Sequence, residues 1–415
     1  MSWSGRGRCS DTEEGAATGR PIACRASQLL VKGSYLALAL ATAVIVSSAL
    51  LVYVQQRRQL RKPEVLGVYA YMYRFPNRSL PADWGELLAK LKLAGASIVL
   101  PFVIDSAGYA YYNSSIVLRN EAYMQRYRGD PLRDLLDLAR RSGVKVYAWV
   151  VIGRVNRGVL EKHPEWAVYD VTGKSCLEKA TPSGFLYLNP AMSEAREYVK
   201  AYVKEIVEKY DVDGVVWEDD LGWPPYPDWG YGPFTKEAFA SWLGVLDLEW
   251  PKDIVEGGKY YGKFIEWRVQ VVSDFACELY RTVKSVRGIP VGAAVSPSLS
   301  WQKRLMGVDW VEWAKRGCVD FLSPMVYHRD ENQPPIWVYW SLKDVQRTLE
   351  SAGATVQLVP SVGGSLANTG SMPPAEWVEG VGWAAEAGAS KVFVFADVCL
   401  DKAGAWEALG SFMRG

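Results

Sequence analysis

The chain contains the stretch Val212-Asp213-Gly214-Val215-Val216-Trp217-Glu218-Asp219-Asp220, an apolar run that ends in three consecutive carboxylates. Its length and its apolar, β-branched content predict a buried strand. Because side chains alternate along a strand, Glu218 and Asp219 point to opposite sides of it. Acids crowded at a strand end repel one another, so some of them must hold a proton. A solvated acidic turn that merely ends the strand is the alternative interpretation.

The same apolar pattern recurs along the chain after Pro63, and helical patterns separate most of the runs. The predicted strands are Val65–Met72, Ser97–Ile104, Lys145–Gly153, Val212–Asp219, Pro290–Ser296, Val319–Tyr327, Thr355–Val362 and Lys391–Val398. The predicted helices are Asp83–Ala94, Pro131–Ser142, Ser193–Tyr210 (with Ser193 as the cap), Tyr261–Val286, Ser341–Ala352, Pro374–Ala387 and Ala403–Met413. Near-continuous apolar strands that alternate with helices indicate a parallel sheet covered on both faces.

Eight such strand units predict a (β/α)8 TIM barrel with aromatic-rich loop insertions. An open, doubly wound sheet is the competing fold. That fold is disfavoured because Met72-Tyr73-Arg74-Phe75, rather than a Gly-rich nucleotide turn, follows the first strand.

Residues 34–54 carry no charge, and a run of that length can cross a bilayer as a helix. No clear small-residue cleavage site follows it, so we expect a single membrane anchor rather than a cleaved signal peptide. The expected organisation is therefore a disordered tail at 1–33, the anchor at 34–54, a linker at 55–63 and the barrel at 64–415.

The orientation of this anchor depends on two opposing arguments. Basic residues stand more densely after the run than before it, so the positive-inside rule alone would keep the barrel in the cytoplasm. A long domain can be translocated despite such a bias, and a groove for polymers is useful at the cell surface. We therefore expect a single-pass membrane protein with its barrel outside the cytoplasm.

Composition excludes several classes of protein. The 415 residues carry 47 basic and 46 acidic side chains, which leaves no positive excess to meet nucleic acid. With only His163 and His328, a His-rich zinc site is not expected, and we expect no cofactor. The six cysteines form no CxxC pair, and the four in the main domain permit one or two disulfides. The 18 Trp and 23 Tyr suit either sugar stacking or a large core.

In a TIM barrel the chemistry lies at the carboxyl ends of the strands. The acids there that could work in catalysis are Glu218, Asp219 and Asp220. The side chains expected to bind substrate are Asp105, Trp149, Arg154, Trp223, Tyr327, His328 and Asp397. No lysine stands at a strand's carboxyl end, which disfavours a Schiff-base aldolase.

Three features permit two interpretations each. Trp149 lines the floor of a groove or belongs to the barrel core. The insertion Leu221–Asp253, with six Trp and Tyr residues, forms a wall for a sugar chain, packs as a small subdomain, or does both. The glycine loop Ser361-Val362-Gly363-Gly364-Ser365 cradles a phosphate or is an ordinary turn.

Several motifs together resemble the glycoside-hydrolase-like TIM barrels. They are Lys145-Val146-Tyr147-Ala148-Trp149, His163-Pro164-Glu165-Trp166, Leu188-Asn189-Pro190, the 213–220 stretch and Phe321-Leu322-Ser323-Pro324-Met325-Val326-Tyr327. With Pro233-Phe234-Thr235, the 213–220 stretch looks most like the C-terminal hydrolase domain of the poly-β-1,6-N-acetylglucosamine deacetylases. That family has a His where this chain has Glu218, followed by two Asp that match Asp219 and Asp220. The resemblance implies that Asp219 is the catalytic acid.

The leading hypothesis is thus a membrane-anchored glycoside hydrolase acting on a surface polysaccharide, such as an amino-sugar polymer. Asp219 would protonate the leaving oxygen, with its pKa held up by Glu218 or Asp220. Asp105, Asp397 or a group of the substrate would stabilise the cationic transition state, with retention or inversion left open. Deacetylation is not expected, because two His are too few for that family's metal site. The alternatives are a non-catalytic carbohydrate-binding barrel and a metal- or phosphate-dependent TIM-barrel enzyme.

Overall fold

The computed structural model describes residue 47 and residues 60–365 and 372–415. The expected tail at 1–33 lies outside these residues, as does the expected anchor at 34–54 apart from Ser47. Within the described part of the chain, no helix is both long and apolar enough to cross a membrane. The barrel belongs to the unit Leu60–Gly415.

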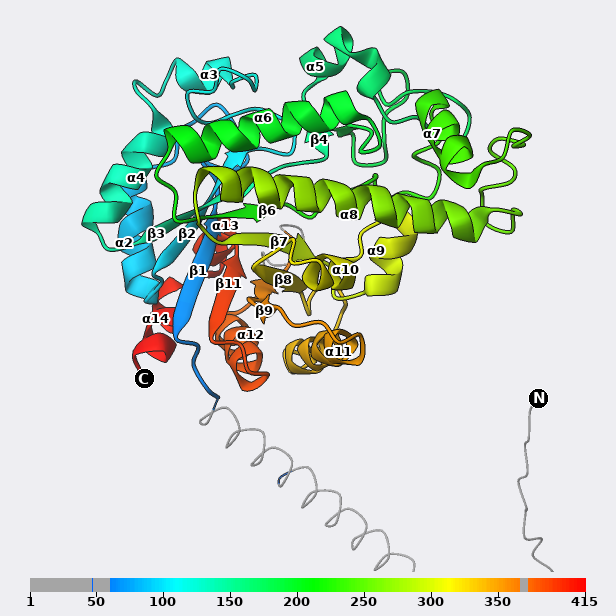
Figure 1. The fold of residues 1–415 in the computed structure, drawn as a ribbon. Coiled ribbons are helices and arrows are strands. Elements are labelled where there is room, and N and C mark those ends of the chain that lie inside the picture. Colours follow the sequence, from blue (N-terminus) through cyan, green and yellow to red (C-terminus); the bar gives the residue numbers. More distant parts are fainter. Residues whose placement is uncertain (1–46, 48–59, 366–371) are drawn as a thin grey trace, which may run out of the picture. The chain divides into compact units, whose positions relative to one another are not determined.

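A closed parallel sheet forms the centre of this unit (Figure 1). Its strands are β1 Val65–Ala70, β2 Ile98–Ile104, β3 Lys145–Val150, β6 Gly214–Trp217, β7 Val291–Val295, β8 Phe321–Val326, β9 Gln357–Leu358, β10 Ser361–Gly363 and β11 Lys391–Phe395. The short strands β9 and β10 together fill the seventh position, and β10 pairs with both β8 and β11. That double pairing closes the sheet, which confirms the TIM barrel and rules out the open, doubly wound fold.

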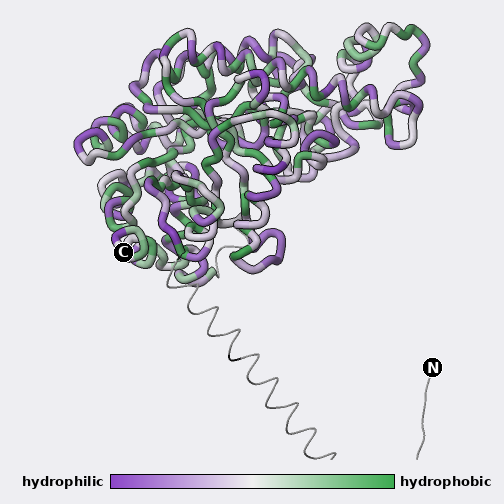
Figure 2. Tube along the Cα trace, turned by 60° about the horizontal axis from the view of Figure 1, so that its bottom comes forward, coloured by the Kyte–Doolittle hydropathy of each residue, from purple (hydrophilic) through white to green (hydrophobic). Residues whose placement is uncertain are grey.

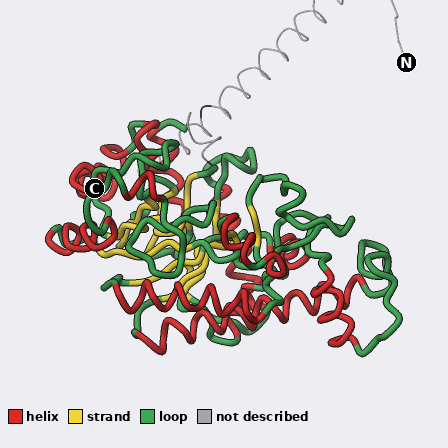
Figure 3. Tube along the Cα trace, turned by 90° about the horizontal axis from the view of Figure 1, so that it is seen from above, coloured by secondary structure: helices red, strands yellow, loops and turns green. Residues whose placement is uncertain are grey.

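Helices surround the strands, as the view from above shows (Figure 3). The outer helices are α2 Trp84–Ala94, α4 Pro131–Arg141, α6 Ser193–Lys209, α8 Tyr261–Val286, α11 Trp337–Ser351, α12 Pro374–Glu386 and α14 Trp406–Arg414. Hydrophilic and hydrophobic residues alternate along them (Figure 2), as is typical of helices that cover a sheet with one face. Asp83 and Asp130 cap α2 and α4 by accepting backbone N–H bonds.

Several boundaries differ from the prediction. Ser193 is the first residue of α6 rather than its cap, and the capping position belongs to Met192. The last strand ends at Phe395, and Asp397 begins the short helix α13 Asp397–Ala403. Several short elements within the loops were not predicted from the sequence. These are α3 Glu121–Met124, β4 Arg154–Val155, α5 Arg157–Lys162, η1 Pro164–Trp166, β5 Leu186–Tyr187, α7 Pro233–Leu243, α9 Leu299–Met306 and α10 Trp310–Lys315.

Aromatic rings near the amino ends of the strands fill the barrel interior, each opposite a glycine of a neighbouring strand. The in-register pairs are Gly67 with Phe393, Gly214 with Tyr147, and Gly292 with Phe321. A Cβ atom at any of these glycines would overlap the paired ring, so only glycine leaves the room. The three rings also contact one another from three separate strands, which places them inside the barrel. This packing supports the strand ends above it.

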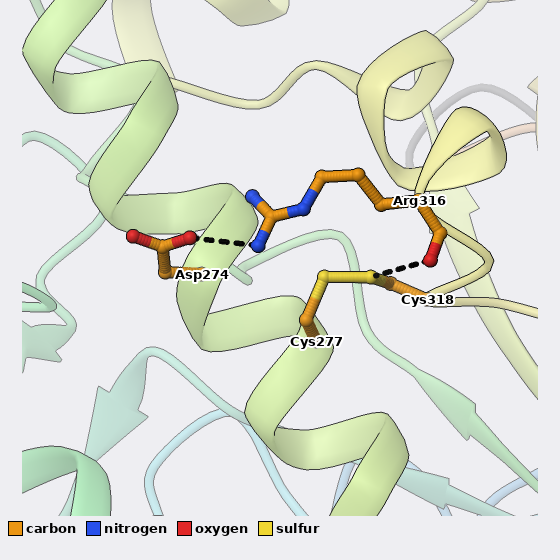
Figure 4. The surroundings of a disulfide bond; sticks show 4 residues. All are labelled: Asp274, Cys277, Arg316 and Cys318. Atoms are coloured by element: carbon orange, nitrogen blue, oxygen red, sulfur yellow. Dashed lines mark hydrogen bonds and ion pairs between the residues drawn. A yellow bond between two sulfur atoms is a disulfide. The ribbon is translucent and has the colours of Figure 1, made fainter.

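A disulfide joins Cys277 of α8 to Cys318, just before β8 (Figure 4). Beside it, Arg316 Nη2 lies 2.8 Å from Asp274 Oδ1, so an ion pair reinforces the same junction. The prediction that the main domain could hold one or two disulfides is confirmed for one pair. Cys176 is buried as a thiol.

Candidate active site

Arg154 joins the three acids that follow β6 into one cluster. Its Nη2 atom lies 3.1 Å from Glu218 Oε1 and 3.0 Å from Asp219 Oδ1, and its Nε lies 3.2 Å from Asp220 Oδ2. Burial disfavours a charged guanidinium, but the charges of Asp220, Glu218 and Asp219 together outweigh that effect and raise the pKa of Arg154. The guanidinium therefore stays charged and holds the three carboxylates together.

Asp220 is the most deeply buried acid of this cluster. Only 2% of its side chain is exposed, and it accepts backbone N–H bonds from Ile152, Gly153 and Arg154 at 2.8 to 3.0 Å. These bonds fix the loop that leaves β3 as well as the Arg154 backbone. With its lone pairs in use, Asp220 orients Arg154 rather than meeting a substrate.

Glu218 has the environment of a carboxyl group that keeps its proton. Its side chain is 16% exposed. Burial, followed by the charge of Asp219, raises the pKa of Glu218 to about 8, against the opposing effects of Arg154 and of a hydrogen bond from Trp149 Nε1. At neutral pH this site therefore supplies a protonated carboxyl group one residue away from Asp219.

Asp219 is the acid that solvent reaches most readily. Its side chain is 42% exposed, more than twice as much as that of Glu218. Burial raises the pKa of Asp219, while Arg154 acts in the opposite direction. Asp219 thus combines proximity to a proton-holding neighbour with access to ligands.

A groove of about 560 Å³ opens beside this cluster. Asp219, Asp220 and Arg154 form one side of it, and residues from the loops after β7 and β8 form the other. The remaining lining residues are Ser183, Phe185, Tyr187, Pro225, Tyr226, Ser296, Pro297, Ser298, Trp301, Gln302, Met306, Met325, Tyr327, Asp330 and Glu331. The groove combines aromatic faces with carboxylates, which is the chemistry that a sugar chain requires.

Of the predicted substrate-binding residues, Arg154 and Tyr327 line this groove. The Tyr327 hydroxyl lies 3.2 Å from Ser361 Oγ. Trp149 instead belongs to the barrel core, because it is 1% exposed and stacks on Phe102 with ring centroids 3.7 Å apart. It reaches the site only through its indole N–H bond to Glu218.

The structure places three other predicted residues in packing or loop structure. Asp105 is fully buried, accepts N–H bonds from Ala107 and Tyr109, and so fixes the loop after β2. Trp223 is fully buried with Arg268 stacked 4.7 Å from its ring centre. His328 is 1% exposed and lies 3.3 Å from Glu376.

Asp397 lines a second cavity of about 500 Å³ near α2 and α13. Burial raises the pKa of Asp397 to about 7, although the backbone N–H groups of Val398 and Tyr71 oppose this. Asp397 is not among the residues that line the groove beside Asp219.

Sequence reasoning missed most of the groove's aromatic lining. Trp301, on α9, is 38% exposed. Phe185, beside the antiparallel pair β4–β5, carries the Arg154 guanidinium 5.2 Å from its ring centre. The apolar run Phe185-Leu186-Tyr187 was a readable strand signal, but nothing local shows that this strand faces the acids.

The structure also shows the roles of the insertion Leu221–Asp253 and of the glycine loop Ser361–Ser365, for which the sequence left two interpretations each. The insertion after β6 packs mainly as a subdomain, in which Phe239 and Trp250 contact Phe264 of α8, while Tyr226 lines the groove. In the glycine loop, Ser361–Gly363 is strand β10, and the Ser365 amide donates to Asp330 at 2.8 Å. The Asp330 carboxylate therefore already accepts the hydrogen bond of an amide that a bound phosphate would need as a donor.

The "Glycosyl hydrolase-like 10" family model matches residues 83–334. Glycosyl hydrolase DigH of Escherichia coli K12 is 26% identical over 229 residues, which cover 48% of this chain and 46% of DigH. Glycosyl hydrolase YngK of Bacillus subtilis is 20% identical over 284 residues, covering 59% and 48%. The chain thus spans about half the length of the curated relatives it matches.

Among solved structures, the PgaB (BpsB) glycoside hydrolase domain from Bordetella bronchiseptica superposes with a TM-score of 0.65 at 17% identity, covering 85% of this chain and 99% of that domain. Alpha-L-fucosidase isoenzyme 2 from Paenibacillus thiaminolyticus gives 0.55 at 13% identity, over 85% and 49%. At these identities the likeness concerns the fold. Together with the family match, it confirms the predicted resemblance to glycoside-hydrolase-like barrels.

Proposed function

Since this chain belongs to the glycosyl hydrolase-like 10 family, we propose that it hydrolyses glycosidic bonds in a surface polysaccharide, with Asp219 as the general acid. One observation carries the proposal: Asp219 is the solvent-accessible member of a carboxylate pair, and both members lie within 3.1 Å of the same Arg154 Nη2 atom. The pair combines a proton reservoir with an exposed donor, as acid-catalysed glycoside cleavage requires.

The chemistry then follows from the two environments. Asp219 gives its proton to the leaving glycosidic oxygen as the bond to the sugar carbon breaks, and positive charge develops on the sugar ring. Water then adds to that carbon and gives up a proton to the Asp219 carboxylate, which restores the acid for the next turnover. Glu218, whose raised pKa keeps it protonated at neutral pH, adds no second negative charge beside Asp219. Arg154 stabilises whichever of the two is ionised.

We expect a group of the substrate itself to stabilise the developing positive charge. Asp105 is committed to its own loop, and Asp397 lines the second cavity. The N-acetyl oxygen of an amino sugar can stabilise this charge in their place, as it does in substrate-assisted glycosidases.

An amino-sugar polymer also suits the groove's charge. Asp219, Asp220, Asp330 and Glu331 line it, with Arg154 as the cation beside Asp219 and Asp220. A neutral or amine-bearing chain avoids the repulsion that a polyanionic glycan would meet there. The predicted anchor at 34–54 would hold the enzyme at the membrane, with the barrel outside the cytoplasm.

The experiment is to incubate the purified chain with partially N-acetylated poly-β-1,6-glucosamine, with a neutral β-glucan and with a uronic-acid polymer, and to measure new reducing ends. We expect release from the amino-sugar polymer. Calorimetric binding without any reducing ends would instead support the non-catalytic barrel. Protease added to intact cells tests the location, because a barrel outside the cytoplasm is digested without lysis.

A further inference from the structure

An aromatic patch lies on α11 and on α12, the helix that Leu60 contacts. The aromatic patch consists of Tyr339 and Trp340 on α11 and Trp383 on α12; Trp340 is exposed, and the other two are half-buried. The Trp340 side chain is 56% exposed, the largest exposure among the described aromatic residues. The Tyr339 ring centre lies 4.9 Å from that of Trp340 and 6.3 Å from that of Trp383. None of these side chains lines the groove or the second cavity.

The chain leaves the barrel beside this patch. Leu60 packs on Gly382, so closely that a Cβ atom there would lie 2.9 Å from Leu60 Cβ. The Arg61 amide donates to Glu386 Oε1 at 2.7 Å. Both contacts are on α12, on either side of Trp383, and Figure 1 shows the segment before β1 near this helix.

The sequence limits how far a membrane can be from this point. Only residues 55–59 stand between the apolar run at 34–54 and Leu60. Even when fully extended, that spacing reaches about 20 Å. If 34–54 is the anchor, the barrel surface around Leu60 must therefore lie close to the lipid headgroups.

The chemistry of the surface fits that environment. Trp and Tyr concentrate at membrane–water interfaces, where their rings rest among headgroups and their polar atoms remain hydrated. Lys343 lies 5.6 Å from the Tyr339 ring centre, and the sequence places Arg57, Arg58, Arg61 and Lys62 in the adjoining segment. Cations near the surface attract anionic lipids.

We propose that the aromatic patch rests in the headgroup region of the membrane that the anchor crosses. The inference rests on the anchor in the proposed function. Leu60 precedes the first residue of β1, at the amino ends of the strands, whereas the acids of the groove follow the carboxyl end of β6.

Lipid photocrosslinking with the full chain in its native membrane tests the proposal. A photoreactive p-benzoylphenylalanine is placed at Trp340, and in a matched variant at Trp242, which is 40% exposed on α7 outside the patch. After irradiation, covalent phospholipid is measured on the protein by mass. We expect several-fold more lipid adduct from position 340 than from position 242.

Two other results would overturn it. Equal or absent lipid adducts at 340, in protein that still resists extraction by alkaline carbonate, would show that the anchor holds but the patch faces elsewhere. Crosslinks from 340 to a second copy of the chain, in place of lipid, would make the patch a self-association surface. Release by carbonate would refute the anchor and this inference together, while glycan cleavage measured on the same sample reports separately on the hydrolase.

Discussion

The indole N–H of Trp149 donates a hydrogen bond to Oε2 of Glu218, and Arg154 holds the other oxygen of that carboxyl group. Trp149 is itself fixed by its stack on Phe102 and by edge contacts with Tyr69 and Phe395. The position of the proton-holding acid is therefore set by the packed interior of the barrel rather than by a mobile loop.

Replacing Trp149 by Phe removes this N–H while keeping an aromatic ring in the core. A buried carboxyl group then loses a donor, and we expect a loss of stability of about 1–3 kcal/mol. Because the bond lowers the pKa of Glu218, its removal should raise that pKa further. Rate profiles against pH should show the alkaline limb moved upward, with KM nearly unchanged. A changed KM with an unmoved limb would mean that Trp149 acts as a groove wall.

The Glu218→Gln variant should be stabilised relative to wild type as the pH rises. The pKa of Glu218 is raised from 4.5 to about 8, so between these values the folded protein holds a proton that the unfolded chain has released. The contribution of the Glu218 carboxyl group to wild-type stability therefore falls as the pH rises between these two values. The amide of the Gln variant does not titrate and avoids this loss. We expect the difference in unfolding free energy to grow by on the order of a few kcal/mol, as measured by urea unfolding at pH 5 and pH 8. A difference that does not vary with pH would contradict this environment.

Trp301→Ala should weaken substrate binding without disturbing the fold. Its indole is 38% exposed on the groove wall, where it can stack on a sugar ring. We expect KM to rise about tenfold, which corresponds to about 1.4 kcal/mol, with kcat little changed. Trp242→Ala is the matched control, because Trp242 is similarly exposed outside the groove. An equal change of KM in the two variants would show that Trp301 does not contribute to substrate binding.

Cys277→Ser should cost about 2–4 kcal/mol of stability, since it opens a loop closed over 41 residues. Dithiothreitol should lower the melting temperature of wild type and leave that of the variant unchanged. Cys176→Ser, which removes a buried thiol, controls for the substitution itself. Disulfides persist mainly in oxidising compartments, so alkylation of Cys277 in freshly isolated protein would contradict an extracytoplasmic barrel.

The barrel was predictable because its signals are local. Buried parallel strands carry continuous apolar residues, and the bounds Tyr261–Val286 of α8 follow directly from the helical spacing. The acid cluster was equally visible, since strand ends bring Glu218, Asp219 and Asp220 to one face of a barrel.

The groove's outline was less predictable because it depends on contacts between distant loops. Trp223 and His328 stand at strand ends yet turn into the packing against Arg268 and Glu376. Trp301 sits in a segment with no strong local pattern, and only the closure of the barrel brings it opposite Asp219. The sequence could not show which of several buried acids keeps an exposed oxygen.

The measurement that bears most directly on the proposed function is the rate of reducing-end release from the amino-sugar polymer by Asp219→Asn. The change is nearly isosteric and relieves repulsion, so the melting temperature should hold or rise. Loss of the general acid should lower kcat by about 10²–10⁴-fold. Asp137→Asn, at an exposed position on α4 outside the groove, is the matched control and should retain nearly full activity. Wild-type turnover by a folded Asp219→Asn variant would remove Asp219 from the mechanism and contradict the account.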